Sequence, residues 1–189
     1  MRHTTSPTEA DDLRAIARRI KRPVVLVGMM GVGKSTIGRR LAGLLQTGFV
    51  DADDAIEDAA QLSVAEIFER HGEDYFRDGE RRVIARLMDE GSGVVATGGG
   101  AFCNEQTRAS ILQRGIAVWL DCDIETLVER TARKSHRPLL QTGDPREILT
   151  RLHAERKQFY EQAPIRVVSD DGPHAETARD ILEAIDRWL

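Results

Sequence analysis

Short apolar runs alternate along this 189-residue chain with longer stretches in which apolar side chains recur every three to four residues. The run VVLVG at residues 24–28 is rich in β-branched side chains and has no polar position, which is typical of a strand buried on both faces. Similar runs predict four more strands, one of which, GFVDAD, ends in acids. The predicted strands are residues 24–28, 48–53, 92–97, 116–121 and 165–169.

Helical periodicity fills the intervals between these strands. Helices are expected at residues 34–45, 63–72, 73–90, about 104–114, 123–133 and 145–162, followed by a final helix that ends at Leu189. Ser63 and Glu66 form a capping box at the start of the second helix, and Gly72 marks its end. The alternation predicts an α/β fold with a five-stranded parallel sheet, covered by helices on both faces and joined by right-handed crossovers.

The chain is interpreted as a single domain over residues 1–189, because it contains no repeat, linker or low-complexity tract. Residues 1–22 are expected to form a helical N-terminal extension that begins at a capping Ser6, carries one apolar stripe, and either packs on the domain or lies loosely against it. A polar segment at about residues 130–143 is expected to act as a flexible lid.

Composition narrows the class of protein. The chain is 41% hydrophobic and 31% charged, which indicates a soluble globular protein. Its net charge of −4 argues against a general nucleic-acid partner. No apolar run approaches the roughly 20 residues of a membrane span and no signal-peptide core is present, so neither a membrane partner nor export is expected. Cys103 and Cys122 form no metal-type pair and are interpreted as reduced thiols of a cytoplasmic protein.

The segment VLVGMMGVGKST at residues 25–36 carries the strongest chemical signal. Gly28, four further residues, and then Gly33, Lys34 and Ser35 match the phosphate-binding loop, and the predicted strand and helix flank it as that motif requires. Its backbone N–H groups and the positive end of the following helix would bind the phosphates of ATP. The expected ATP-binding residues here are Gly31, Val32, Gly33, Lys34, Ser35 and Thr36. Lys34 would reach the β- and γ-phosphates, and Ser35 would ligate Mg²⁺.

Three acids follow at the end of the second predicted strand: Asp51, Asp53 and Asp54. On an extended chain Asp51 and Asp53 project to the same side, toward the ligand crevice at the carboxyl edge of the sheet. One carboxylate could serve the metal and another could hold an acceptor hydroxyl and take its proton. The alternative is that these acids only favour the start of a helix, and Asp54 is assigned that role alone.

The segment VVATGGG ends another predicted strand in Gly98, Gly99 and Gly100, where backbone N–H groups lie open to a small polar ligand. Many nucleotide hydrolases carry a metal-binding Asp at the end of such a strand. This chain has Ala96 and Thr97 there, so Asp51 is the candidate metal ligand. Three arginines could serve an anionic substrate, although an arginine on a helix is usually a solvated or ion-paired side chain. They are Arg77, Arg137 and Arg156.

The chain closely resembles the shikimate kinase family in six segments that occur in order between about Val24 and Val168. They are GMMGVGKSTIGRRLA, FVDADDAIE, SVAEIFERHGEDYFRDGE, VVATGGGA, RPLL and ERKQFYEQA. The resemblance implies a three-layer α/β/α, P-loop, nucleoside-monophosphate-kinase-like fold. It also implies transfer of the γ-phosphate of ATP to the 3-hydroxyl of shikimate, with one Mg²⁺ per subunit, on the chorismate route to aromatic amino acids. The family suggests a monomer.

The resemblance also assigns site residues. Asp53 resembles the acid that binds the shikimate hydroxyls and acts as base, and Asp51 the acid near the metal. The remaining matches are Arg77 and Arg156 for the shikimate carboxylate, Gly99 and Gly100 for backbone contacts to the ring hydroxyls, Arg137 for a lid arginine that reaches both phosphate and shikimate, and Arg130 for an arginine over the adenine.

Two departures and several alternatives accompany this assignment. The family often has glycine where this chain has Gln61, and the proline of its "R.P.Y" pattern is absent from the segment that begins at Arg156. Another small-molecule kinase, for aminoshikimate or gluconate, shares the phosphate loop. A nucleotide-dependent switch would also keep the loop, but it would have no need of Asp53, Arg77 and Arg156.

Overall fold

The computed structural model describes residues 7–91, 93–132, 143–169 and 172–189. Its centre is a parallel sheet of five strands in the spatial order β2-β3-β1-β4-β5. The strands are β1 (Val24–Val27), β2 (Phe49–Asp51), β3 (Val94–Ala96), β4 (Ile116–Asp121) and β5 (Ile165–Val168). The five-stranded parallel sheet predicted from the sequence is therefore confirmed.

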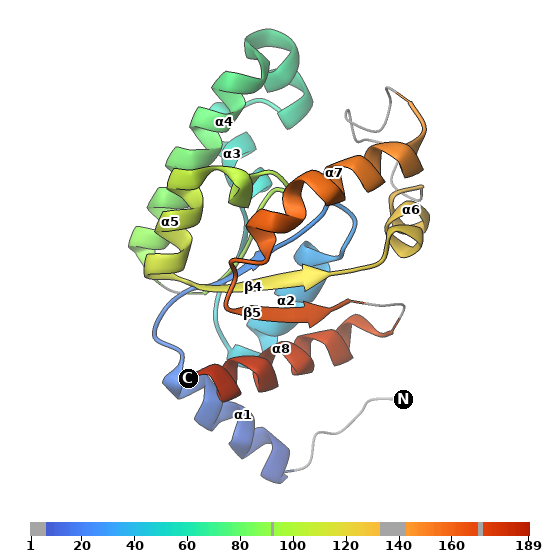
Figure 1. Ribbon diagram of the computed structural model, residues 1–189. Coiled ribbons are helices and arrows are strands. Elements are labelled where there is room, and N and C mark those ends of the chain that lie inside the picture. Colours follow the sequence, from blue (N-terminus) through green and yellow to red (C-terminus); the bar gives the residue numbers. More distant parts are fainter. Residues whose placement is uncertain (1–6, 92, 133–142, 170–171) are drawn as a thin grey trace.

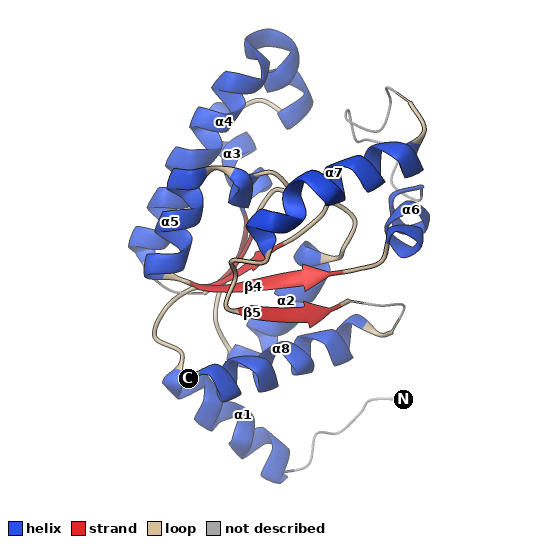
Figure 2. Cartoon of the chain, viewed as in Figure 1, coloured by secondary structure: helices blue, strands red, loops and turns tan. Residues whose placement is uncertain are grey.

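Helices cover both faces of this sheet (Figures 1 and 2). They are α1 (Pro7–Arg19), α2 (Lys34–Leu45), α3 (Ala52–Ala60), α4 (Val64–Glu90), α5 (Glu105–Arg114), α6 (Ile124–Ala132), α7 (Pro145–Tyr160) and α8 (His174–Trp188), with a short 3₁₀ turn, η1 (Ala101–Cys103). Helices α2 and α8 pack together with α1 against them, and α4 and α5 pack together on the opposite side. This is the three-layer α/β/α arrangement that the alternating pattern predicted.

Burial explains why the central strand is wholly apolar. Val24, Val25, Leu26 and Val27 of β1 are fully buried, since neighbouring strands flank β1 and helices cover both of its faces. In β5, by contrast, buried and exposed residues alternate, as expected for a strand at the edge of the sheet. The carboxyl end of β1 therefore lies at the middle of the sheet, where the strand order reverses and ligands of α/β proteins bind.

The structure corrects the predicted element around the acids. Strand β2 ends at Asp51, and α3 begins at once with Ala52, so Asp53 lies in the first turn of a helix and not on an extended strand. The Asp51 side chain caps this helix by accepting a hydrogen bond from the Asp53 N–H. The argument that placed both side chains on one side of a strand was therefore wrong, and the helix-start alternative describes the backbone correctly.

Two predicted helices join at a kink. The capping box between Ser63 and Glu66 is present, and Gly72 departs from helical geometry with φ +82° inside α4. Helix α4 packs against α3, and the part that follows the kink runs beside α5 (Figure 1).

Helix α1 lies against α2 and α8. Leu13, Ile16 and Ile20 are half-buried on the core, and Arg19 forms an ion pair with Asp186. The predicted cap at Ser6, the core of the predicted lid and Arg137 lie outside the described residues. Within the described ranges, no helix has the length and apolar character to cross a membrane.

Candidate active site

The phosphate loop connects β1 to α2 with a backbone that requires glycine. Gly28 has φ +137°, and a Cβ built there would lie 2.4 Å from the Leu120 carbonyl oxygen. Gly33 has φ +100° and immediately precedes α2, so the loop turns directly into the helix N-terminus. Gly31, Val32, Ser35 and Thr36 occupy this same turn and first helical residues, which is the arrangement that points backbone N–H groups at an anion.

Lys34 is buried at the base of the loop. Its ammonium donates hydrogen bonds to the carbonyl oxygens of Gly28 and Met29, both at 2.8 Å. A fixed positive charge therefore lies beside the loop, where the phosphate groups of a nucleotide would bring negative charge.

Ser35 and Asp51 meet beside the loop. The Ser35 hydroxyl donates to Asp51 Oδ2 at 2.5 Å, while Asp51 Oδ1 holds the Asp53 N–H at 3.1 Å. Hydroxyl and carboxylate oxygens are hard donors of the kind that Mg²⁺ takes, and Mg²⁺ usually keeps several waters and one or two protein ligands. Within the described residues, no group of three or more His, Cys, Asp and Glu side chains lies close enough to hold a metal ion. The donor set therefore fits Mg²⁺.

Charged side chains surround the glycine turn, Gly98–Gly100, that follows β3. A Cβ on Gly98 would lie 2.7 Å from Glu80 Oε1 and 3.1 Å from Asp53 Oδ1. A Cβ on Gly99 would lie 3.2 Å from Arg156 Nη1, and a Cβ on Gly100 would lie 2.9 Å from both terminal nitrogens of Arg77. A side chain at any of these three positions would therefore displace or crowd a charged group, and the turn brings together residues from α3, α4 and α7.

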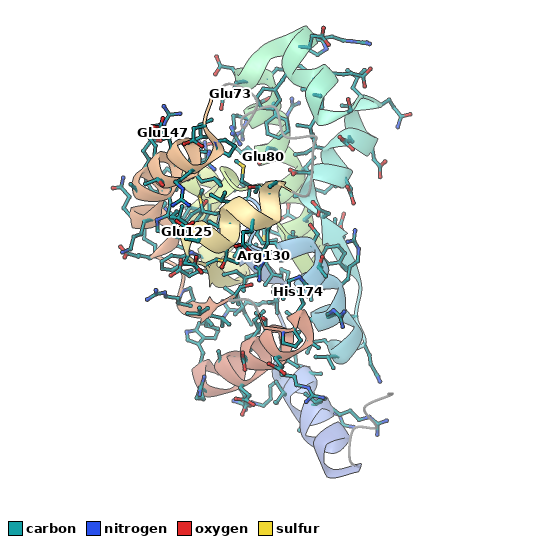
Figure 3. The ribbon with its side chains drawn as sticks, turned by 90° about the vertical axis from the view of Figure 1, so that its right-hand side faces the viewer. Glu73, Glu80, Glu125, Arg130, Glu147 and His174 are labelled. Atoms are coloured by element: carbon teal, nitrogen blue, oxygen red, sulfur yellow. The ribbon has the colours of Figure 1, made fainter. Side chains whose placement is uncertain are left out.

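Glu80 is a site residue that the sequence did not predict. It lies on α4 (labelled in Figure 3), is only 2% exposed, and pairs with Arg77 at 2.8 Å. Burial raises the pKa of the Glu80 carboxyl, and the Arg77 guanidinium opposes that rise. An Arg and a Glu three residues apart on a helix look like an ordinary surface ion pair in the sequence, so only the fold shows that this pair is internal.

Three buried polar atoms of this cluster have no hydrogen-bond partner among the described residues. They are Asp53 Oδ1, Glu80 Oε1 and Arg156 Nη1. Buried polar groups are nearly always paired, so a group of three around one turn indicates a polar ligand or bound water. The set combines two acceptors with one cationic donor, which suits a small molecule that carries both hydroxyl and anionic groups.

Asp53 has the protonation behaviour of a proton acceptor. Burial, followed by the negative charges of Asp51 and Glu80, raises its pKa from 3.8 to about 6, although the Lys34 charge opposes this. A carboxylate with a pKa this close to neutrality is still mostly ionised at pH 7, yet it is a stronger base than an exposed aspartate.

Arg130 lies apart from this cluster. Its guanidinium donates to the Val32 carbonyl of the phosphate loop at 3.3 Å and to Ser169 at the end of β5. In Figure 3 it lies lower in the view than Glu80, toward His174, whose ring contacts the position of a Gly33 Cβ at 3.3 Å. Arg130 therefore lies against the phosphate loop and apart from the charged cluster at the glycine turn.

Cys103 follows the glycine turn in η1 and is half-buried. Burial raises the pKa of its thiol, which makes it a poor nucleophile.

Together, the sheet order, the phosphate loop after the central strand and the charged cluster at the glycine turn define a P-loop phosphotransferase with the nucleoside-monophosphate-kinase-like fold. The family model described as "Shikimate kinase" matches residues 30–186. The chain belongs to the shikimate kinase family.

Known proteins agree with this membership. The chain is 61% identical over 193 residues to a shikimate kinase from Novosphingobium aromaticivorans, with 100% of both chains covered. Its fold matches that of a shikimate kinase from Acinetobacter baumannii, solved in complex with shikimate, at a TM-score of 0.86 and 36% identity, over 90% of this chain and 97% of that one. A gluconokinase from Sinorhizobium meliloti matches at a TM-score of 0.56 and 17% identity, over 89% of this chain and 94% of that one, which shows the shared fold alone.

Proposed function

We propose that this protein is a shikimate kinase, which transfers the γ-phosphate of ATP to the 3-hydroxyl of shikimate and so forms shikimate 3-phosphate and ADP. The observation that carries the proposal is the group of unpartnered polar atoms around the glycine turn, on Asp53, Glu80 and Arg156. They adjoin the phosphate loop, since a Cβ on Gly99 would lie 3.3 Å from the Met30 backbone nitrogen. Family membership and the likeness to a protein solved with shikimate support the choice of acceptor.

Shikimate is held at both ends. Arg77 and Arg156 bind its carboxylate with charge-assisted hydrogen bonds, which are stronger than neutral ones. Asp53 and the backbone of Gly99 and Gly100 bind the ring hydroxyls. The buried ion pair with Glu80 fixes Arg77 at the edge of the turn, so the guanidinium is ordered before the substrate arrives.

Asp53 takes the proton of the attacking hydroxyl. The new bond forms between the 3-oxygen and the γ-phosphorus as the bond from that phosphorus to the bridging oxygen breaks, and ADP leaves with the electron pair. The hydroxyl proton goes to Asp53, whose raised pKa makes it a suitable acceptor near neutral pH.

The phosphate loop, residues 31–36, binds the phosphates of ATP, the phosphoryl donor, and Lys34 supplies a fixed positive charge there. Mg²⁺ held by Ser35 and Asp51, one ion per subunit, would supply further neutralisation of phosphate charge. Arg130 serves the nucleotide, and Arg137 is proposed as the lid arginine on the strength of the family resemblance alone. The enzyme is proposed to act as a cytoplasmic monomer.

The test is ADP release from Mg-ATP with no acceptor, shikimate, aminoshikimate, gluconate or a nucleoside monophosphate. Turnover with shikimate well above the other acceptors is expected. A clear preference for aminoshikimate or gluconate would keep the phosphotransferase class but reassign Arg77 and Arg156. ADP release that is equally fast without acceptor would instead indicate a hydrolase or a switch.

A further inference from the structure

Tyr160 is a buried side chain whose hydroxyl reaches the glycine turn. It lies at the end of α7, is fully buried, and donates a hydrogen bond to the Gly99 carbonyl at 2.5 Å. The same hydroxyl lies 3.8 Å from the sulfur of Met29 in the phosphate loop. A single hydroxyl group therefore lies where the phosphate loop and the glycine turn approach each other.

The ring of Tyr160 is held firmly in place. It stacks on Trp119 of β4 with ring centroids 6.1 Å apart and an interplanar angle of 28°. Trp119 is itself buried and is covered by the guanidinium of Arg166 at 4.9 Å. A ring packed in this way gives the hydroxyl a defined position, so the bond to Gly99 can direct the turn and not merely follow it.

Arg156 and Tyr160 contact the same glycine from one face of α7. They are four residues apart, which places their side chains one turn from each other on the same helix face. Gly99 lies against both: Arg156 Nη1 would be 3.2 Å from a Cβ there, and Tyr160 bonds its carbonyl. Burial raises the pKa of the Tyr160 hydroxyl above its usual range, although the Arg156 charge opposes this, so the group remains a protonated donor.

The hydrogen bonds of the glycine turn fall into two sets. The carbonyls of Gly98 and Gly100 accept from Ala101 and Cys103, at 3.2 and 3.1 Å, and the Gly99 carbonyl accepts from Tyr160. Within the described ranges, no recorded backbone or side-chain acceptor takes the N–H of any of the three glycines. All three carbonyls are thus occupied by the protein, while the N–H donors are left for a ligand.

The peptide plane converts the Tyr160 bond into an orientation. The Gly99 carbonyl and the Gly100 N–H belong to one rigid trans peptide and point in opposite directions. Glycine gives this plane unusual rotational freedom, since neither neighbour has a side chain to restrict it. A bond to the oxygen therefore fixes the direction in which the Gly100 N–H points.

We propose that Tyr160 is a positioning residue for the acceptor: its hydroxyl orients the Gly99–Gly100 peptide, and α7 places Arg156 beside it, so that both meet the substrate together. This rests on the proposed function for the identity of the acceptor. The chemistry required of that acceptor is a hydroxyl for the peptide N–H and an anionic group for the guanidinium.

A second attachment keeps α7 in place without the Tyr160 hydroxyl. Arg108 of α5 donates to the carbonyls of Phe102 and Cys103 at 3.1 and 3.0 Å, and to the Gln162 side chain at 2.9 Å. Its guanidinium also lies over the Phe159 ring at 5.0 Å. Loss of the hydroxyl alone should therefore change the orientation of the peptide and leave the fold intact.

The test is Tyr160→Phe, with Tyr75→Phe as the matched control. Tyr75 is the other tyrosine of the chain, is 50% exposed and stacks on His71, so its variant loses the same atom from a side chain that makes no recorded bond to the turn among the described residues. We expect Tyr160→Phe to raise the KM for shikimate about five- to tenfold, the effect of one lost hydrogen bond, with the KM for ATP unchanged. The amides of residues 98–103 should exchange faster with solvent, and the control should match the wild type in every respect.

Each other result overturns the positioning role. An unchanged KM for shikimate together with unchanged amide exchange would show that the hydroxyl does not orient the turn. Equal losses for shikimate and ATP, with a lower melting temperature, would show a merely structural role. Wild-type protein that lacks shikimate turnover would contradict the proposed function instead, and amide exchange, which needs no substrate, would still decide the role of Tyr160.

Discussion

Asp53→Asn should make the protein more stable while removing its activity. The carboxylate is half-buried beside Asp51 and Glu80, and its pKa is raised from 3.8 to about 6. A raised pKa means that the folded state binds the proton more tightly than the unfolded state, so the wild type loses stability as pH rises through this window. Below about pH 4 the penalty is absent, and above about pH 6 it is complete.

The size of the effect follows from the same values. A pKa that moves from 3.8 to about 6 corresponds to about 3 kcal/mol of penalty at pH 8. Asp53 lies in the first turn of α3, where its negative charge interacts favourably with the helix dipole. Loss of that charge removes roughly 0.3–1 kcal/mol of stabilisation, which offsets part of the gain. A net gain of about 2 kcal/mol would raise the melting temperature by roughly 4–8 °C for a chain of this length.

The assay is urea unfolding of wild type and Asp53→Asn from pH 4 to pH 8, with Asp54→Asn as control. The Asp54 carboxylate lies one residue further along the same turn but is exposed, and burial raises its pKa only in part against the opposing charge of Arg39, so Asp54→Asn should gain far less stability at pH 8 than Asp53→Asn. The advantage of Asp53→Asn should grow between pH 4 and pH 6 and then level off. A variant that is no more stable at pH 8, or whose advantage is the same at pH 4, would refute the account of Asp53 as a destabilised buried base.

Three further predictions concern neighbouring residues. Gly98→Ala should lower shikimate-dependent turnover by about 100-fold or more with nucleotide binding retained, because the new methyl lies 2.7 Å from Glu80 Oε1; full activity would contradict the required close approach. Arg77→Ala and Arg156→Ala should each raise the KM for shikimate far more than the KM for ATP; parallel losses for both substrates would argue for a structural role. Arg77→Ala should also lower the free energy of unfolding by about 3 kcal/mol, because it leaves Glu80 buried without its ion-pair partner. Gln61→Gly should raise the melting temperature by roughly 2–4 °C with unchanged kinetics, because Gln61 has φ +53° at the end of α3; a lower melting temperature would mean that its side-chain bond to the Asp58 carbonyl outweighs the strain.

The predictable parts of the fold are those whose determining residues lie close together in the sequence. The phosphate loop is contiguous, so its glycines, Lys34 and the flanking strand and helix could all be recognised together. The Ser63 capping box and the break at Gly72 are equally local. Strand β1 was predictable because a run without any polar residue can only lie where both faces are covered.

The residues proposed to bind shikimate could be predicted only in part. Arg77 and Arg156 stood out through family resemblance, since periodicity alone does not separate them from solvated arginines. Glu80 and Tyr160 were not predicted as site residues, because burial and contact with the glycine turn arise from the packing of α4 and α7 against it. Asp53 was predicted as a strand residue, but it lies in the first turn of a helix, beside the position of a Gly98 Cβ.

The charged side chains around the glycine turn explain why it contains three glycines. From the sequence, three in a row indicated open backbone N–H groups. In the structure, each position also faces a different charged side chain, and a Cβ would collide with or crowd every one of them. The turn is therefore the point at which α3, α4 and α7 contribute to one site.

The most direct test of the account is to identify the product formed from Mg-ATP and shikimate by phosphorus NMR. The account predicts a single new phosphate monoester, coupled to the proton at carbon 3 of shikimate, in amounts equal to the ADP formed. Inorganic phosphate in place of the ester, or an ester at another hydroxyl, would contradict it.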